Sequence, residues 1–82
     1  MVKIKLSYYD VNEKFMCTQK QYSFLQGLMN KTKYEELWLN HLAFNGREKL
    51  SISEASKLID CCLKQKEFVI VKQTKDETVL IG

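Results

Sequence analysis

Three segments of this chain of 82 residues begin with the same helix-start signal, and that repetition constrains the fold more than any other feature. The signal is a Ser or Thr three residues before a Glu or Gln, at Thr18 and Gln21, at Thr32 and Glu35, and at Ser51 and Glu54. In such a capping box the two residues satisfy backbone N–H groups of the first helical turn reciprocally. We therefore expect helices over residues 19–30, 33–45 and 52–66.

Each expected helix carries apolar side chains at helical spacing, so each has one face for a common core. These faces hold Tyr22, Leu25, Leu28 and Met29, then Tyr34, Leu37, Trp38, His41, Leu42 and Phe44, then Ile52, Ala55, Leu58, Ile59, Cys62 and Leu63. The pair Asn45-Gly46 predicts a left-handed end to the second helix. Cys61 points about 100° away from Cys62 on a helix, and we expect it outside the core.

Both ends of the chain have strand-like sequences. Val2, Ile4 and Leu6 alternate with polar residues, which is typical of a half-buried strand. Residues 68–71 form an apolar run, expected to be a central strand, and residues 78–81 are expected to return as its hairpin partner. The prediction is one α+β domain over residues 1–82, with three amphipathic helices packed on a small, mainly antiparallel sheet formed by the N- and C-terminal strands.

Composition and segment lengths indicate a cytoplasmic protein without membrane contact. No stretch approaches the roughly 18 apolar residues that cross a bilayer. The alternating N-terminal residues are unlike the continuous apolar block of a signal peptide. The cysteine count of three is odd, which fits a compartment where thiols stay reduced.

The residues that carry enzyme chemistry are sparse. The single histidine, His41, falls within an apolar helix face, where we expect a core residue with one hydrogen-bond partner. The three glycines are scattered, so there is no phosphate-binding loop, and no Cys-x-x-Cys spacing indicates a metal site. The chain is expected to be no enzyme and to hold no cofactor and no metal.

Lysines give one candidate binding surface. The net charge is +3, which permits contact with nucleic acid without demanding it. The candidate residues lie on the expected first strand and on the first and third helices: Lys3, Lys5, Lys20, Lys57 and Lys64. If these side chains converge, they meet phosphates in a salt-dependent way. Asp60, between Lys57 and Lys64 on the same side of the helix, works against an uninterrupted basic track.

Two blocks of the sequence show a resemblance to a known module. Residues 17–28 read CTQKQYSFLQGL, and residues 49–59 read KLSISEASKLI. They resemble a short helical module common in bacteriophage and Firmicute DNA-metabolism proteins, with the pattern T-x-K-Q-x-x-x-[IL]-x-x-L followed by L-[ST]-x-x-E-A-S-x-L-I. The matched positions are Thr18, Lys20, Gln21, Leu25 and Leu28, then Leu50, Ser51, Glu54, Ala55, Ser56, Leu58 and Ile59.

That module often serves as an accessory segment of recombination and single-strand-annealing proteins. The resemblance covers less than half of this chain, and here the spacer holds a further aromatic-rich helix. It implies a phage-like context associated with nucleic acid. The leading hypothesis is thus a phage-type accessory protein that binds nucleic acid, with DNA favoured over RNA, through its lysines.

A second hypothesis comes from a different class of function, in which a small phage-encoded inhibitor or adaptor docks on a host protein such as a nuclease or a replication factor. Its interface would use exposed apolar and acidic side chains: Tyr9, Glu35, Glu36, Leu39 and Glu48. A homodimer formed by pairing exposed strand edges is compatible with either function.

Overall fold

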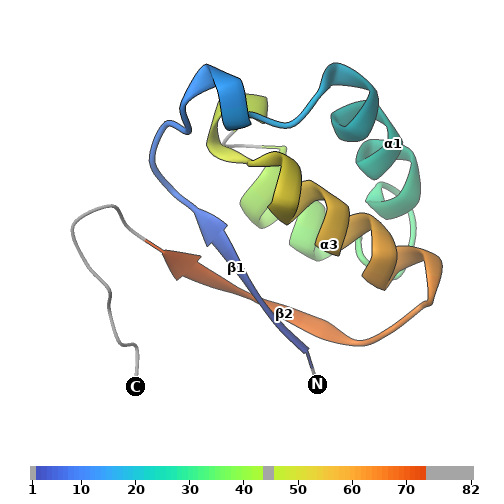
Figure 1. The fold of residues 1–82 in the computed structure, drawn as a ribbon. Helices are drawn as coiled ribbons and strands as arrows, with labels where there is room; N and C mark the ends of the chain where they lie inside the picture. The colour runs from blue at the N-terminus through green and yellow to red at the C-terminus, as the bar shows by residue number, and fades with distance from the viewer. Residues whose placement is uncertain (1, 44–45, 74–82) are drawn as a thin grey trace.

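The computed structural model describes residues 2–43 and 46–73, in which a helical layer covers a small sheet (Figure 1). The elements are β1 (Val2–Ser7), the 3-10 helix η1 (Glu13–Phe15), α1 (Gln19–Met29), α2 (Glu35–Leu37), the π-helix η2 (Trp38–Leu42), the 3-10 helix η3 (Arg47–Lys49), α3 (Ile52–Leu63) and β2 (Phe68–Gln73). Helix α3 lies between α1 and the sheet, so it is the central helix of the layer (Figure 1).

The sheet corrects the expectation of a mainly antiparallel arrangement. β1 and β2 pair in parallel, from Val2 opposite Phe68 to Ser7 opposite Gln73. Parallel neighbours need a long crossover, and here all the helices of the described residues lie between the two strands in sequence. Helix α3 returns the chain to the end of the sheet where β1 starts, and the Val2 N–H donates to the Glu67 carbonyl at 3.3 Å. The expected hairpin partner, residues 78–81, lies outside the described residues.

Two of the three expected capping boxes are confirmed. The Thr18 hydroxyl accepts from the Gln21 N–H at 3.0 Å, and the Ser51 hydroxyl accepts from the Glu54 N–H at 3.1 Å. In both helices the Glu or Gln side chain also accepts from the N-cap N–H. These bonds join residues three apart in sequence, so they depend on little besides the local chain.

The third expected capping box does not form. The Thr32 hydroxyl accepts from the Tyr34 N–H at 3.2 Å, and the Glu35 carboxylate accepts from the Lys31 N–H at 2.9 Å. Lys31 has a φ of 62°, a left-handed conformation that turns the chain after α1. The polar side chains expected to start a helix instead stabilise this turn.

The expected helix over residues 33–45 is also wrong in its form. One short α-helical turn, α2, passes directly into the π-helix η2, in which the Ala43 N–H donates to the Trp38 carbonyl at 2.8 Å. Such wide turns are rare in proteins. Here the widened turn buries Trp38 and Leu42 together. Gly46 has a positive φ of 80°, which favours glycine, but its ψ of 176° differs from the expected left-handed helical cap, and Asn45 lies outside the described residues.

The core lies between α3 and the elements on either side of it. It includes Ile4 and Leu6 of β1, Leu25 and Met29 of α1, Trp38 and Leu42 of η2, Ala55, Leu58, Cys61 and Cys62 of α3, and Phe68 of β2. Cys61 is 6% exposed, so the expectation that it lies outside the core is wrong. Conversely, Ile52 and Leu63 were expected inside and are exposed. Both errors arise because the buried arc of α3 is rotated from the expected one, towards Glu54 and Cys61.

A buried carboxylate fastens α3 to the sheet. Glu54 is 9% exposed, and its Oε2 accepts from the Ser7 N–H at 2.7 Å and from the Ser7 hydroxyl at 3.0 Å. Its Oε1 accepts from the Ser51 N–H at 2.8 Å. One side chain therefore completes the cap of α3 and holds the end of β1 against that cap.

Candidate nucleic-acid interface

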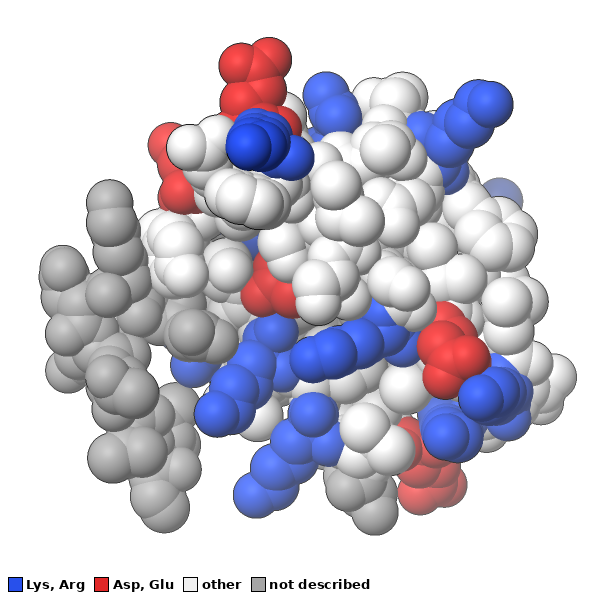
Figure 2. All heavy atoms as spheres, in the orientation of Figure 1, with Lys and Arg blue, Asp and Glu red and all other residues white. Residues whose placement is uncertain are grey.

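Lysines from three different elements converge beside the first strand. A hollow of about 290 Å³ is lined by Lys3 of β1, Lys57 of α3 and Lys66 of the loop before β2, together with Val2, Ile4, Asp60 and Cys61. We call it the lysine hollow. Figure 2 shows Lys and Arg side chains gathered along the part of this face that covers the two strands of Figure 1. Three cations around one concave site favour an anionic ligand.

Acidic residues reduce this positive charge only in part. Asp60 lines the hollow, and its Oδ1 lies 3.3 Å from the Nζ of Lys64, one helical turn further along. Both side chains of this ion pair are more than half exposed, so the pair adds little stability. It does neutralise Asp60, which leaves Lys3, Lys57 and Lys66 to set the sign of the local potential.

Some of the predicted lysines lie close together in the structure, and one lies apart from them. Lys3 and Lys57 line the hollow, and Lys64 lies at its rim through Asp60. Lys5 is exposed two residues after Lys3, so it points to the same side of β1. Lys20 lies in the first turn of α1, on the far side of α3 from the sheet (Figure 1). It therefore does not belong to this surface.

Sequence reasoning missed Lys66. The expected helix over residues 52–66 made it the last helical residue, whereas α3 ends at Leu63. Gln65 then adopts a φ of 52°, and the Lys66 N–H donates to the Cys61 carbonyl at 3.0 Å. This turn brings Lys66 to the lysine hollow. The sequence carries no glycine or asparagine there to signal a left-handed residue.

The residues of the alternative protein interface fall into two groups. Glu35, Glu36 and Leu39 belong to the α2–η2 segment, where Leu39 is 54% exposed. Tyr9 lies in the loop after β1, and Glu48 lies close to the same loop. The Val11 N–H of this loop donates to the Glu48 carbonyl at 2.9 Å. The five residues thus come from two separate segments, and no described contact unites them into one patch.

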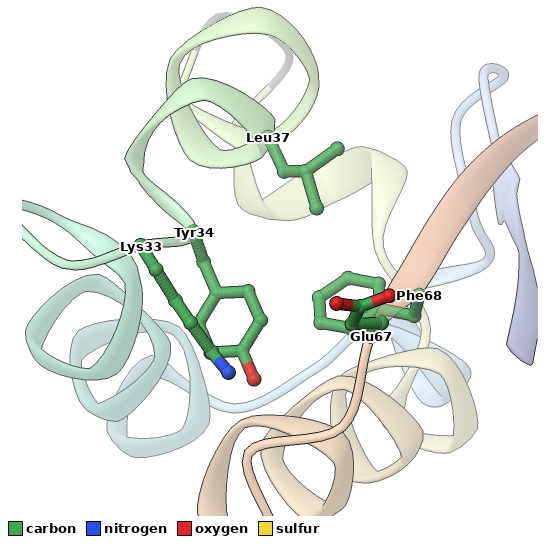
Figure 3. A pocket seen from close by; sticks show the side chains of 5 residues that line it. All are labelled: Lys33, Tyr34, Leu37, Glu67 and Phe68. Atoms are coloured by element: carbon green, nitrogen blue, oxygen red, sulfur yellow. The ribbon is translucent and has the colours of Figure 1, made fainter. Parts of the chain in front are cut away.

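A second hollow, of about 270 Å³, lies at the start of β2 (Figure 3). Tyr34 and Phe68 stack there with ring centroids 5.1 Å apart, and Lys33 extends beside Tyr34. The Tyr34 hydroxyl donates to the Lys66 carbonyl at 2.8 Å, and the Lys33 ammonium donates to the Gln65 carbonyl at 3.1 Å. The Lys33 ammonium and the Tyr34 hydroxyl are therefore already hydrogen-bonded within the chain. We interpret the site as a structural contact that stabilises the turn at Lys66.

The cysteines are not arranged for nucleophilic chemistry. All three are buried, and none forms a disulfide. Burial raises the pKa of Cys17, and burial with a smaller contribution from Cys61 raises the pKa of Cys62 to about 11. The thiolate is the reactive form, so both groups stay protonated and inert at neutral pH.

His41 lies in η2 and is half-buried. Its Nδ1 is hydrogen-bonded to the Tyr8 hydroxyl at the end of β1, so it joins η2 to the sheet. Burial lowers the pKa of His41 and raises the pKa of Tyr8, so both side chains are neutral at pH 7. The ammonium of Lys72 lies 5.0 Å from the centre of the Tyr8 ring, a cation–π contact.

The lowered pKa of His41 predicts a loss of stability in mild acid. Its pKa in the folded chain lies below the unfolded value of about 6.5, so the unfolded chain binds the proton more readily. The contribution of neutral His41 to the free energy of unfolding is complete above about pH 6.5. It is lost as the pH falls through the pKa of His41 in the folded chain. Urea unfolding at pH 7.5 and pH 5.5 should show this decrease for the native chain, and His41→Asn should remove most of it. Equal decreases in both proteins would contradict the assignment.

Within the described ranges, no group of three or more His, Cys, Asp or Glu residues is placed to hold a metal ion. In the same ranges, no helix combines the length and the apolar character needed to cross a membrane. Comparisons of the chain with protein-family models, curated proteins and solved structures find no match. The candidate function must therefore be argued from the geometry of the surface.

Proposed function

We propose that this chain is a non-catalytic accessory protein that binds nucleic acid, most readily DNA, through the lysine hollow and the adjoining side of β1. The observation that carries the proposal is the convergence of Lys3, Lys57 and Lys66 on one concave site. The residues come from a strand, a helix and a loop, so their meeting is a product of the tertiary fold. A cytoplasmic protein of phage type is the context that the resemblance in α1 and α3 supports.

The dimensions of the hollow suit contact with a phosphate backbone along its rim. A volume of about 290 Å³ is too small for a nucleotide chain, so successive phosphates would run along the surface, each nearest a different one of the three lysines. Lys5 extends the positive charge along β1 from Lys3. Lysine acts on phosphates as a point charge, which gives affinity without base recognition. We therefore propose binding with little sequence preference.

The salt dependence of binding is the first expected result. If Lys3, Lys57 and Lys66 each neutralise one phosphate of a duplex, log Kd should rise with log salt concentration with a slope of about 2.7. Fluorescence anisotropy with a labelled 20-base-pair duplex and with the matching single strand, at several salt concentrations, measures this slope. A single strand with the same contacts should give a slope of about 2.

Charge reversal tests the assigned surface. The double variant Lys57→Glu/Lys66→Glu should weaken duplex binding roughly 10- to 100-fold and reduce the slope to about 0.9, because two phosphate contacts are lost. The matched control is Lys14→Glu/Lys20→Glu, which has the same net charge but changes η1 and α1. It should bind nearly as the native chain does. Circular dichroism of both variants checks that they remain folded.

Two results would contradict the proposal. Equal weakening by both double variants would indicate a general charge effect without a defined site. No binding to either nucleic acid at low salt would exclude the function itself. A protein partner captured after nuclease treatment would then favour the inhibitor or adaptor hypothesis, with Leu39 and its neighbours Glu35 and Glu36 as the first residues to change.

A further inference from the structure

The side of β1 that faces away from β2 carries backbone groups available for a further strand. The Val2 N–H donates to the Glu67 carbonyl, so alternate residues of β1, beginning with Val2, direct their N–H and C=O groups towards β2. The residues between them direct theirs to the opposite side: Lys3, Lys5 and Ser7. We call this opposite side of the strand the β1 edge.

The contact between Ser7 and Glu54 confirms the direction of these backbone groups. The Ser7 N–H points away from β2 and donates to the Glu54 carboxylate at 2.7 Å, which closes one end of the β1 edge. The N–H and C=O groups of Lys3 and Lys5 have no hydrogen-bond partner in the part of the chain that the structure describes. The open part of the edge therefore presents two donors and two acceptors in alternation.

This alternation of donors and acceptors is complementary to an extended peptide. A second extended backbone has the same alternation, so it can pair with both kinds of group and join the sheet as a further strand. A phosphate group offers acceptor oxygens, so it could meet the two N–H groups but not the two carbonyls. The backbone of the β1 edge thus favours a peptide, whatever the lysine side chains bind.

Lysines lie on both faces of any strand that pairs with the β1 edge. The side chains of Lys3 and Lys5 share the outer face of the sheet, about 6.6 Å apart along the strand. On the face towards α3, Lys57 and Lys66 line the lysine hollow beside Val2. Because the side chains of an added strand alternate between these faces, acidic residues in it would meet ammonium groups in either orientation.

The same lysines disfavour other strands at this edge. If the β1 edges of two copies paired, Lys3 and Lys5 of one copy would lie opposite the lysines of the other, and like charges directly opposite are destabilising. Lysines on an exposed edge also protect it from pairing with apolar strands. A segment that carries carboxylates removes both obstacles, because each lysine then gains an opposite charge.

We propose that the β1 edge binds an extended acidic segment of a partner protein, which adds to the sheet as a further strand beside β1. The backbone groups of Lys3 and Lys5 hold the segment, and the surrounding lysines select its charge. The inference goes beyond the nucleic-acid function and does not rest on it, since phosphates would contact the lysine side chains alone. Both ligands use Lys57 and Lys66, so they would exclude one another.

A pair of synthetic peptides separates strand pairing from charge attraction. The probe is a fluorescently labelled seven-residue peptide of alternating Glu and Val, which combines negative charge with a preference for the extended conformation. The control has the same sequence and charge, but each backbone amide is N-methylated and cannot donate. Fluorescence anisotropy should show that the native chain binds the control at least about tenfold more weakly, because the backbone hydrogen bonds are lost.

A matched pair of variants tests the edge from the side of the protein. Lys5→Gln removes the charge, whereas Lys5→Pro removes the charge and also the outward N–H, which an edge strand tolerates. Lys5→Pro should bind the Glu-Val peptide at least about tenfold more weakly than Lys5→Gln does. The two variants should bind duplex DNA equally, because that contact uses the side chain. Circular dichroism checks that both remain folded.

Amide hydrogen exchange of the native chain locates the contact without any substitution. In the free chain the amides of Ile4 and Leu6, which pair with β2, should exchange slowly, and those of Lys3 and Lys5 should exchange fast. Saturation with the Glu-Val peptide should slow the exchange of Lys3 and Lys5 at least about tenfold. Nuclear magnetic resonance measures each amide separately.

Three outcomes would overturn the proposal. The first is a native chain that does not bind the Glu-Val peptide even at low salt. The second is equal binding of the N-methylated peptide, which would show charge attraction without strand pairing. The third is unchanged exchange of the Lys3 and Lys5 amides in the saturated complex, which would place the peptide elsewhere. Binding of the peptide by a chain that binds no DNA would support this inference and exclude only the nucleic-acid function.

Discussion

Replacing Glu54 with alanine should lower the free energy of unfolding by about 2 to 4 kcal/mol, because the change removes a helix cap and also leaves buried donors without a partner. The carboxylate accepts from Ser7 at both N–H and hydroxyl and from the Ser51 N–H. Glu54→Gln should have an intermediate effect, since one carboxylate oxygen becomes an NH₂ group that faces a donor. Urea unfolding followed by circular dichroism measures both values.

The matched control is the equivalent residue of the other confirmed capping box. Gln21 occupies the same position in α1, and its Oε1 accepts from the Thr18 N–H at 3.0 Å. It makes no contact with β1 among the described hydrogen bonds, so Gln21→Ala should cost about 0.5 to 1 kcal/mol. A loss at Glu54 no larger than the loss at Gln21 would show that the link between α3 and β1 adds nothing to stability.

Truncation of Trp38 should be the most damaging single change, at about 3 to 5 kcal/mol. The side chain is 4% exposed and contacts Tyr22 of α1, so it fills the space between η2 and α1. Trp38→Ala would leave a cavity there and remove the packing that supports the widened turn of η2. A domain of this size has a total stability of about 4 to 12 kcal/mol, so the variant should be partly unfolded at 37 °C.

Leu39 provides the neighbouring control. It follows Trp38 in the same π-helix but is 54% exposed, so Leu39→Ala should change the free energy of unfolding by no more than about 0.5 kcal/mol. Urea titration and the thermal midpoint compare the two variants directly. Similar losses for both would mean that η2 does not pack on α1 as the structure describes.

The candidate site was partly predictable from the sequence. Lys3 could be assigned to the outer face of β1 because side chains alternate along a strand, and Lys57 could be assigned to an exposed side of α3. Their convergence could not be predicted, because it depends on how α3 packs on the sheet. Lys66 was missed since the end of α3 depends on the left-handed residue Gln65, which has no specific signal in the sequence.

Which apolar residues of α3 are exposed could not be predicted for the same reason. Helical spacing assigned Ile52 and Leu63 to the core, because periodicity identifies an apolar arc but not how much of it a neighbour covers. The buried arc of α3 contains Glu54, Leu58 and Cys61, so Ile52 and Leu63 lie at its exposed edge. Only the packing of three elements around α3 decides which of its apolar residues are buried.

The sequence by itself determined the features that rest on contacts within a few residues. These are the capping boxes at Thr18 and Ser51, the alternation of β1 and the positive φ of Gly46. The tertiary structure decided the parallel direction of the sheet and the π-helical form of η2. It also decided that Lys3, Lys57 and Lys66 line one hollow. The physical reason is that these features depend on partners distant in sequence, whose packing and hydrogen bonds outweigh a local propensity of a few tenths of a kcal/mol.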